Sequence, residues 1–341
     1  MSSENAVDRR NAVGSASADR TISSSPLRHA PSGDVTMSAE DTWRWGDVRE
    51  TDITPSWIGG DGIFTEGVDG EGRDVLRRRF PVSELPYASD VDSVTTLMRA
   101  AADRGIAPDV IESGPDYVIM RRMPDSWRSA KLDELRNPYL LWAVLEQRRR
   151  IHDIPLSQLP GVAHRSMLDQ MAQMRDRCIA DGVPLPRLVD RVLESLGPFL
   201  RRADEFREMA VPCHGDGAAS NVLVDTAPDS GSAARPMLTG WTVCGIMDPI
   251  EDAGSVLAEV GPFCGVPASL ISGMGLPSDA LPVAQAYGIV NDVYWGIIGL
   301  WRSATSQDPT IDFAKYGLWR LQKAANQLVL PIGPASWLAS L

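Results

Sequence analysis

The most informative stretch of the 341-residue chain is VPCHGDGAASNVLV, residues 211–224. Asp216 is followed five positions later by Asn221, on a predicted loop that runs into the short apolar strand 222–224. A carboxylate can orient an attacking hydroxyl or accept its proton, and an amide oxygen can coordinate a magnesium ion that bridges phosphate oxygens. The pair therefore supplies part of the positioning and charge neutralisation that phosphoryl transfer needs.

The pattern around this loop changes from strands to helices along the chain. Residues 50–80 contain short apolar runs separated by glycine-rich turns, which is typical of antiparallel strands. A helix is predicted over 91–104 and a compact strand over 117–120. Helical patterns then cover residues 138–152, 165–182, 186–208 and most of 253–329. The sequence thus predicts an α+β protein with a small β-rich N-lobe and a larger helical C-lobe.

Composition also divides the chain into segments. Residues 1–43 are rich in Ser, Ala, Asp and Arg and nearly lack aromatic and long aliphatic side chains. Such a segment cannot bury enough apolar area to offset its ordering entropy, so we expect a disordered tail. The N-lobe is expected over residues 44–124 and the C-lobe over residues 125–341.

The overall charge excludes several classes of partner. The formal net charge is -12, which argues against nucleic acid and against a polybasic patch that binds membranes. The start of the chain lacks the apolar segment of a signal peptide. The apolar stretch 287–301 is interrupted by Asn291 and Asp292, and it is too short and too polar to cross a bilayer. We therefore expect a cytoplasmic protein.

Cysteine and lysine usage narrows the chemistry further. The four cysteines have no C-x-x-C spacing, which predicts neither a zinc site nor a disulfide scaffold. Lysine occurs only three times, against thirty arginines (33 minus 3). A cation that contacts phosphate is therefore expected to be an arginine.

The 211–224 stretch resembles the catalytic loop H-G-D-x-x-x-x-N of the aminoglycoside phosphotransferase and choline kinase family. These are small-molecule kinases with a protein-kinase-like fold, and the motif corresponds to His214, Gly215, Asp216 and Asn221. The resemblance implies that Asp216 is the base or orienting group, that His214 supports the catalytic loop, and that Asn221 binds metal. It also implies ATP or GTP as the phosphate donor, Mg²⁺ as the metal, and a small molecule with a hydroxyl as the acceptor.

Other segments carry the same resemblance, over about residues 45–325. A glycine pair stands where the family has its turn over the nucleotide, a strand follows where the phosphate-contacting cation is found, and residues 117–124 resemble the hinge beside adenine. The nucleotide-binding residues implied in this way are Gly59, Gly60, Arg77, Met120 and Arg122. The acidic C-lobe would suit a cationic acceptor such as an amino alcohol or an aminoglycoside. The aromatic residues between 287 and 319 are expected mainly in the core of the C-lobe, and some of them would face the acceptor.

The chain departs from the family at the second metal-binding aspartate, for which two placements exist. The first assigns this role to Asp248. The second matches Asp248 and Asp252 to a later part of the family pattern, and it puts the metal position on Gly240, which has no ligand atom. We prefer the second placement because both aspartates then fall in register.

The loss of a carboxylate at Gly240 leaves three hypotheses. The first is an ATP-dependent small-molecule kinase that uses Asp216 and Asn221. The second is a pseudokinase that acts as a binding or regulatory module. The third is an unrelated α+β protein with a chance match to the loop. Nothing in the sequence assigns the acceptor, the choice between ATP and GTP, or the oligomeric state.

Overall fold

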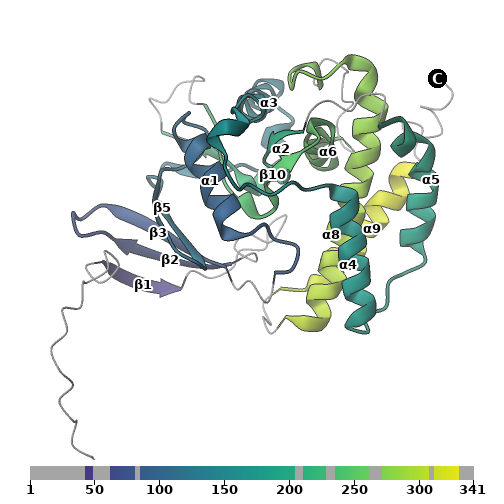
Figure 1. The fold of residues 1–341 in the computed structure, drawn as a ribbon, viewed down its shortest axis with the longest axis horizontal. Helices are drawn as coiled ribbons and strands as arrows, with labels where there is room; N and C mark the ends of the chain where they lie inside the picture. Colours follow the sequence, from purple (N-terminus) through teal and green to yellow (C-terminus); the bar gives the residue numbers. More distant parts are fainter. Residues whose placement is uncertain are drawn as a thin grey trace, which may run out of the picture. The chain divides into compact units, whose positions relative to one another are not determined.

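The N-lobe is built on one antiparallel sheet with the strand order β1-β2-β3-β5-β4 (Figure 1). The structure is a computed structural model, and it describes residues 43–48, 62–80, 85–203, 210–227, 235–261, 271–306 and 311–329. The strands of this sheet are β1 (Arg44–Val48), β2 (Ile63–Val68), β3 (Asp74–Arg79), β4 (Val110–Ser113) and β5 (Tyr117–Arg121). Gly59, Gly60 and residues 1–42 of the expected tail lie outside the described residues.

A tight turn joins β2 to β3, as the glycine-rich sequence predicts. Oδ1 of Asp69 accepts hydrogen bonds from the backbone N–H groups of Glu71 and Arg73, both at 2.9 Å. Gly72 has a φ of 80°, a left-handed conformation that glycine adopts without steric cost. The turn therefore fixes the register in which β2 pairs with β3.

Helix α1 (Val91–Ala102) packs against β4 and β5. The side chain of Asp90 caps it by accepting a hydrogen bond from the Ser93 N–H at 2.7 Å. Apolar side chains recur at helical spacing along α1 and are buried against the sheet. The core here contains Val94, Leu97, Met98, Val118 and Met120.

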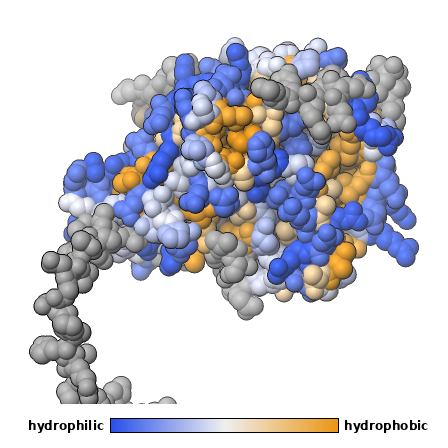
Figure 2. All heavy atoms as spheres, in the orientation of Figure 1, coloured by the Kyte–Doolittle hydropathy of each residue, from blue (hydrophilic) through white to orange (hydrophobic). Residues whose placement is uncertain are grey.

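Helices dominate the C-lobe (Figure 1). They are α2 (Leu132–Leu135), α3 (Pro138–His152), α4 (Met167–Ala180), α5 (Leu188–Arg202), α6 (Pro249–Val260), α8 (Leu281–Thr305) and α9 (Phe313–Val329). Helix α8 packs against both α6 and α9, and its burial over most of its length explains the apolar stretch 287–301. Among the described helices, none combines the length and the apolar composition that crossing a membrane requires. The face seen in Figure 2 is mainly hydrophilic, with apolar side chains in separate patches.

Two small sheets hold the 211–224 segment at both ends. One pairs β7 (Val211–Cys213) with β10 (Gly245–Met247), and the other places β8 (Val222–Asp225) between β6 (Trp127–Ser129) and β9 (Met237–Leu238). The loop between β7 and β8, which carries the H-G-D-x-x-x-x-N motif, is therefore anchored on both sides.

The expected α+β class, with a strand-rich N-lobe and a helical C-lobe, is confirmed. Both lobes belong to one compact unit, residues 42–341. The lobe boundary between residues 124 and 125 stays a prediction.

Candidate active site

Gly215 shapes the loop that carries Asp216. Its φ is 79°, and a Cβ at this position would stand 2.6 Å from the carbonyl oxygen of Val243. Only glycine therefore fits without strain. The Gly215 N–H donates to Oδ1 of Asp252 at 2.8 Å, which ties the loop to helix α6.

The Asp216 carboxylate is held by hydrogen bonds from its own loop. Oδ1 accepts the Ala218 N–H at 3.0 Å, and Oδ2 accepts the side-chain amide of Asn221 at 2.8 Å. The residue is 8 % exposed, and it lines a hollow of about 450 Å³ that includes an open mouth. The carboxylate is therefore ordered, and the hollow that it lines is called below the Asp216 cavity.

His214 supports the loop from behind. Its Nδ1 lies 3.0 Å from the Asp216 carbonyl oxygen, and its Nε2 lies 2.8 Å from the Thr239 carbonyl oxygen. The ring also meets Trp241 edge-on, with centroids 4.6 Å apart. Burial and the nearby Arg148 guanidinium lower the pKa of His214 to about 4, so the ring is neutral at pH 7. These contacts position the loop and leave no ring nitrogen directed at a substrate.

Asp252 of α6 connects two helices to the loop. Its Oδ1 accepts a hydrogen bond from Arg148 Nη1 at 2.6 Å, and its Oδ2 lies 2.9 Å from His152 Nε2, both from α3. Arg148 also donates through Nη2 to the Asp216 carbonyl oxygen. Burial opposes the charge of Asp252, but the Arg148 guanidinium holds its pKa below the ordinary value. We call this set of contacts the Asp252 brace.

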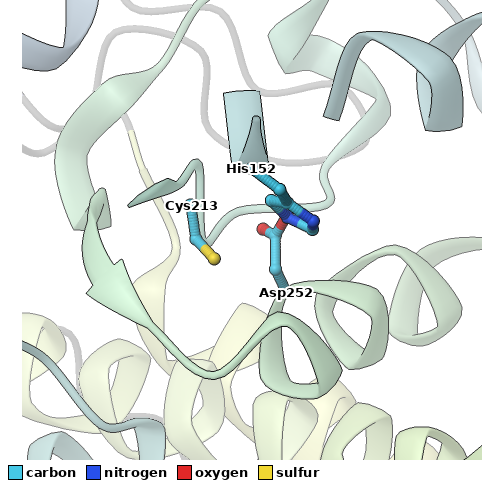
Figure 3. Close-up of side chains that lie close together, drawn as sticks. All are labelled: His152, Cys213 and Asp252. Carbon is cyan, nitrogen blue, oxygen red and sulfur yellow. The ribbon is translucent and has the colours of Figure 1, made fainter. Parts of the chain in front are cut away.

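Cys213 lies beside His152 and Asp252 of the brace (Figure 3). Its Sγ, a ring nitrogen of His152 and a carboxylate oxygen of Asp252 lie within 4.8 Å of one another. This spacing would suit a metal ion. The Asp252 carboxylate is, however, already paired with Arg148, and burial raises the pKa of the Cys213 thiol well above its ordinary value. These contacts favour a structural role for the cluster as part of the brace.

Gly240, the metal position of the second placement, lies directly beside Asn221. Its φ of 71° and ψ of 41° are left-handed. A Cβ here would stand 2.1 Å from Oδ1 and 2.6 Å from Nδ2 of Asn221. The Asn221 amide thus fills the space that a side chain at position 240 would need. An asparagine turned toward Asp216 and a glycine do not fit a two-ligand Mg²⁺ site.

Asp248, the metal ligand of the first placement, is the N-cap of α6. Its Oδ1 accepts the Ile250 N–H at 2.9 Å. It is absent from the described lining of the Asp216 cavity. A metal-binding role for Asp248 stays a prediction, and its hydrogen bond to Ile250 supports a capping role instead.

The arginines of β3 alternate between the two faces of the sheet. Arg77 pairs in register with Thr65 and Ile119, and its guanidinium packs 4.2 Å from the ring centroid of Trp45. Arg78 projects to the opposite face, where it is 4 % exposed and donates to Oγ1 of Thr242 at 2.6 Å.

Arg78 is therefore the arginine that reaches the segment after Gly240, whereas Arg77 lies on the other face of the sheet, because successive strand residues point to opposite faces. The nucleotide-binding role of Arg77 stays a prediction.

The other two nucleotide-binding candidates lie on and after β5. Met120 is buried opposite Leu76 of β3. Arg122 forms ion pairs with Glu66 at 3.4 Å, Asp74 at 3.5 Å and Asp125 at 2.6 Å. These contacts hold the hinge segment against β2 and β3. The nucleotide-binding roles of Met120 and Arg122 stay predictions.

The Asp216 cavity gathers side chains that are far apart in the sequence. Its lining consists of Asp216, Ala218, Ser220, Asn221, Ser255, Glu259, Asn291, Trp295, Tyr316 and Arg320. The sequence left open whether the aromatic residues between 287 and 319 form C-lobe core or face an acceptor; Trp295 and Tyr316 line this cavity. Glu259 and Arg320 were missed. Only the packing of α6, α8 and α9 brings them beside the loop, and no local pattern indicates it.

Comparison with known proteins gives relatives of one kind. The chain is 25% identical over 180 residues to an aminoglycoside 3'-phosphotransferase of Streptomyces ribosidificus, a match that covers 49% of this chain and 66% of that protein. The match therefore spans just under two thirds of the relative's length.

Solved structures share the fold. A choline/ethanolamine kinase family protein from Mesorhizobium loti is 17% identical with a TM-score of 0.64, and the alignment covers 84% of this chain and 89% of that one. The GDP and kanamycin complex of APH(2")-IIia is 12% identical with a TM-score of 0.57, and covers 82% and 94%. These likenesses confirm the two-lobed kinase-like fold.

The family described as "Phosphotransferase enzyme family" has a sequence model that matches residues 65–273, which is more than half of the chain. The match includes β3, the catalytic loop, the Gly240 segment and α6. A chance resemblance confined to one loop is thereby excluded. The chain belongs to the phosphotransferase enzyme family.

Proposed function

We propose that the protein transfers the γ-phosphate of ATP or GTP to a hydroxyl group of a small molecule bound in the Asp216 cavity. The observation that carries this proposal is the Asp216 carboxylate itself. It is ordered by Ala218 and Asn221 and lines the Asp216 cavity, which opens to solvent.

The chemistry follows from the position of Asp216. The acceptor oxygen forms a bond to the γ-phosphorus while the bond from that phosphorus to the β–γ bridging oxygen breaks. The acceptor proton passes to the Asp216 carboxylate, which orients the hydroxyl before transfer. Arg78 supplies positive charge from β3, which is where the resemblance places the cation that contacts phosphate.

Different observations support the nucleotide donor and the type of acceptor. AMP and GDP complexes among the structural relatives support a nucleotide donor. The Glu259 carboxylate and the ring of Trp295 in the cavity wall favour a cationic group on the acceptor. Choline, ethanolamine and aminoglycosides, named for the relatives, are acceptors of this type.

The test measures phosphoryl transfer by Asp216→Ala against a matched control. Oδ1 of Asp225 accepts the N–H of the residue two positions on, Ala227, at 3.0 Å, as Oδ1 of Asp216 does with Ala218. Asp225→Ala therefore loses the same local turn outside the cavity. We expect transfer from ATP or GTP to be lost in Asp216→Ala and kept in Asp225→Ala. Transfer retained by a folded Asp216→Ala variant refutes the proposal.

The role of Arg78 on β3 can be tested with a matched pair of variants. Arg78→Met removes the guanidinium that reaches the C-lobe, and Arg77→Met removes the one that packs on Trp45. A ligand that binds only the native state raises its melting temperature. We expect the rise caused by ATP or GTP to be lost in Arg78→Met and kept in Arg77→Met. The reverse result returns the role to Arg77.

The contact between Gly240 and Asn221 favours a second candidate function, a pseudokinase that binds a nucleotide or another ligand without transfer. A protein of this kind can dispense with the metal ligands that transfer needs. Here position 240 has no carboxylate, and the Asn221 amide is turned toward Asp216. It predicts a melting-temperature rise with nucleotide and no transfer to any acceptor. Phosphoryl transfer that depends on Asp216 excludes it.

A further inference from the structure

Two opposite charges face each other in the wall of the Asp216 cavity. Glu259 comes from α6 and is 9 % exposed, and Arg320 comes from α9 and is 7 % exposed. Oε2 of Glu259 and Nη1 of Arg320 are 3.9 Å apart, which is beyond hydrogen-bond distance. The wall therefore presents an acceptor atom and a donor atom side by side.

The remaining atoms of both side chains are already engaged. Oε1 of Glu259 accepts the Ala219 N–H at 3.1 Å, beside the catalytic loop. Nη2 of Arg320 donates to Oδ1 of Asn291 at 3.2 Å, and its Nε lies 3.0 Å from Oδ1 of Asp292. These contacts fix the direction of the carboxylate and of the guanidinium. Glu259 Oε2 and Arg320 Nη1 have no hydrogen bond to any described residue.

Glu259 Oε2 and Arg320 Nη1 form a long ion pair of 3.9 Å, so each atom can still make a hydrogen bond to a ligand in the cavity. A ligand that carries an ammonium group and a carboxylate on one carbon would satisfy both atoms together. The ammonium would donate to Glu259, and the carboxylate would accept from Arg320. A simple amino alcohol would satisfy Glu259 and would leave the Arg320 donor facing no acceptor.

We propose that the acceptor is a hydroxylated α-amino acid, held by Glu259 and Arg320 with its hydroxyl directed at Asp216. This rests on the proposed function, because Asp216 gives the hydroxyl its role. The oxyanion that Arg320 binds has one other source, the phosphoryl group in transfer. The test separates the two.

The experiment measures binding by calorimetry in the absence of nucleotide. Three matched pairs differ only by a carboxylate: L-serine and ethanolamine, L-threonine and 1-amino-2-propanol, and L-homoserine and 3-amino-1-propanol. Inorganic phosphate is the seventh probe. A charged hydrogen bond predicts that the amino acid of at least one pair binds roughly 10-fold or more tightly than its amino alcohol. Arg320→Gln should abolish that preference.

Two more variants keep the test valid if Arg320→Gln does not fold. Arg320→Lys keeps the charge beside Asp292 but loses the planar fork, so the preference should fall. Glu259→Gln keeps the shape of the side chain and should weaken both members of each pair by removing the partner of the ammonium.

Three outcomes overturn the inference: amino alcohols that bind as tightly as their amino acids, no binding by either member of any pair, and a preference that survives in folded Arg320→Gln. Inorganic phosphate that binds through Arg320 while the amino acids do not also overturns it, and assigns Arg320 to the phosphoryl group. Because no nucleotide is present, failed transfer with an intact preference refutes only the proposed function. Intact transfer without the preference refutes only the acceptor class.

Discussion

The contact between Gly240 and Asn221 can be tested by replacing the glycine with alanine. The new Cβ would stand 2.1 Å from Oδ1 of Asn221, so the Asn221 amide must leave its place. Its hydrogen bond to Oδ2 of Asp216 is then lost, at about 1.5–3 kcal/mol for a bond to a charged group. The left-handed backbone adds about 1 kcal/mol for a residue with a Cβ. Gly240→Ala should therefore lose about 3 kcal/mol of unfolding free energy.

A double-mutant cycle isolates the contact. Asn221→Ala alone loses the same hydrogen bond, but it leaves Gly240 unstrained. In the double variant the three Asn221 atoms nearest to the new Cβ are gone, so only the backbone strain is added to the loss from Asn221→Ala. The double variant should be about 2 kcal/mol more stable than the sum of the single variants predicts. Urea denaturation followed by circular dichroism gives the four free energies.

Additivity of the two substitutions within about 0.5 kcal/mol would refute the reasoning, because it would mean that Asn221 does not occupy the space beside Gly240. Gly240→Asp is the informative companion. It carries the same clash and brings the carboxylate that the family position needs. If displacement of the amide frees its oxygen for a metal, Mg²⁺ should increase the nucleotide-dependent rise in melting temperature in Gly240→Asp more than in Gly240→Ala.

Three other perturbations follow from the buried charges. Asp252→Asn leaves Arg148 without its ion pair and should lower the unfolding free energy by about 3–5 kcal/mol in urea; a loss below about 1 kcal/mol contradicts the brace. Burial raises the pKa of Glu251 to about 7 from an ordinary 4.5. The stability that this group contributes is therefore present below pH 4.5 and is lost as pH rises through 7, by about 3 kcal/mol. In Glu251→Gln the melting temperature should depend less on pH over this range. The lowered pKa of His214, about 4 against an ordinary 6.5, has the opposite sign: stability is present above pH 6.5 and is lost as pH falls through 4, and His214→Gln should reduce that acid-side loss.

The sequence predicted long elements well because their signals are local. The helix predicted over 138–152 coincides with α3, whose first residue is a proline and whose N-cap is Asn137. The strand predicted over 117–120 coincides with β5 but for one residue. The strands β6, β7 and β10 have three residues each, too few for a period-two pattern. They are defined by pairing with distant segments, β7 with β10 and β6 with β8, which anchors the loop between β7 and β8.

The parts of the site that the sequence did not predict depend on strand register or on distant packing. Residues 77–79 are three consecutive arginines, and no composition rule says which of them faces the C-lobe. Pairing of β3 with β2 and β5 decides it, and selects Arg78. Glu259 and Arg320 are sixty-one positions apart, and only the packing of α6, α8 and α9 brings them to 3.9 Å.

The Asp252 brace and Gly240 both affect the position of Asp216. A buried ion pair such as Arg148 with Asp252 adds little net stability over apolar packing, so its value here is the position it gives to the loop of Asp216. Gly240 acts on the same carboxylate from the other side, because any side chain there would displace the Asn221 amide from Asp216. The glycine and the asparagine thus form a matched arrangement around Asp216.

This arrangement predicts how nucleotide binding responds to metal. With the amide committed to Asp216 and no carboxylate at position 240, Mg²⁺ gains few protein ligands when nucleotide binds. The rise in melting temperature with ATP or GTP should therefore change little when Mg²⁺ is added or chelated. The same result is expected when Mn²⁺ replaces Mg²⁺. A rise that appears only with Mg²⁺ contradicts this expectation and requires Asn221 to turn away from Asp216. The Asn221→Ala variant tests that turn, because it should then lose the metal-dependent part of the rise while keeping the rest.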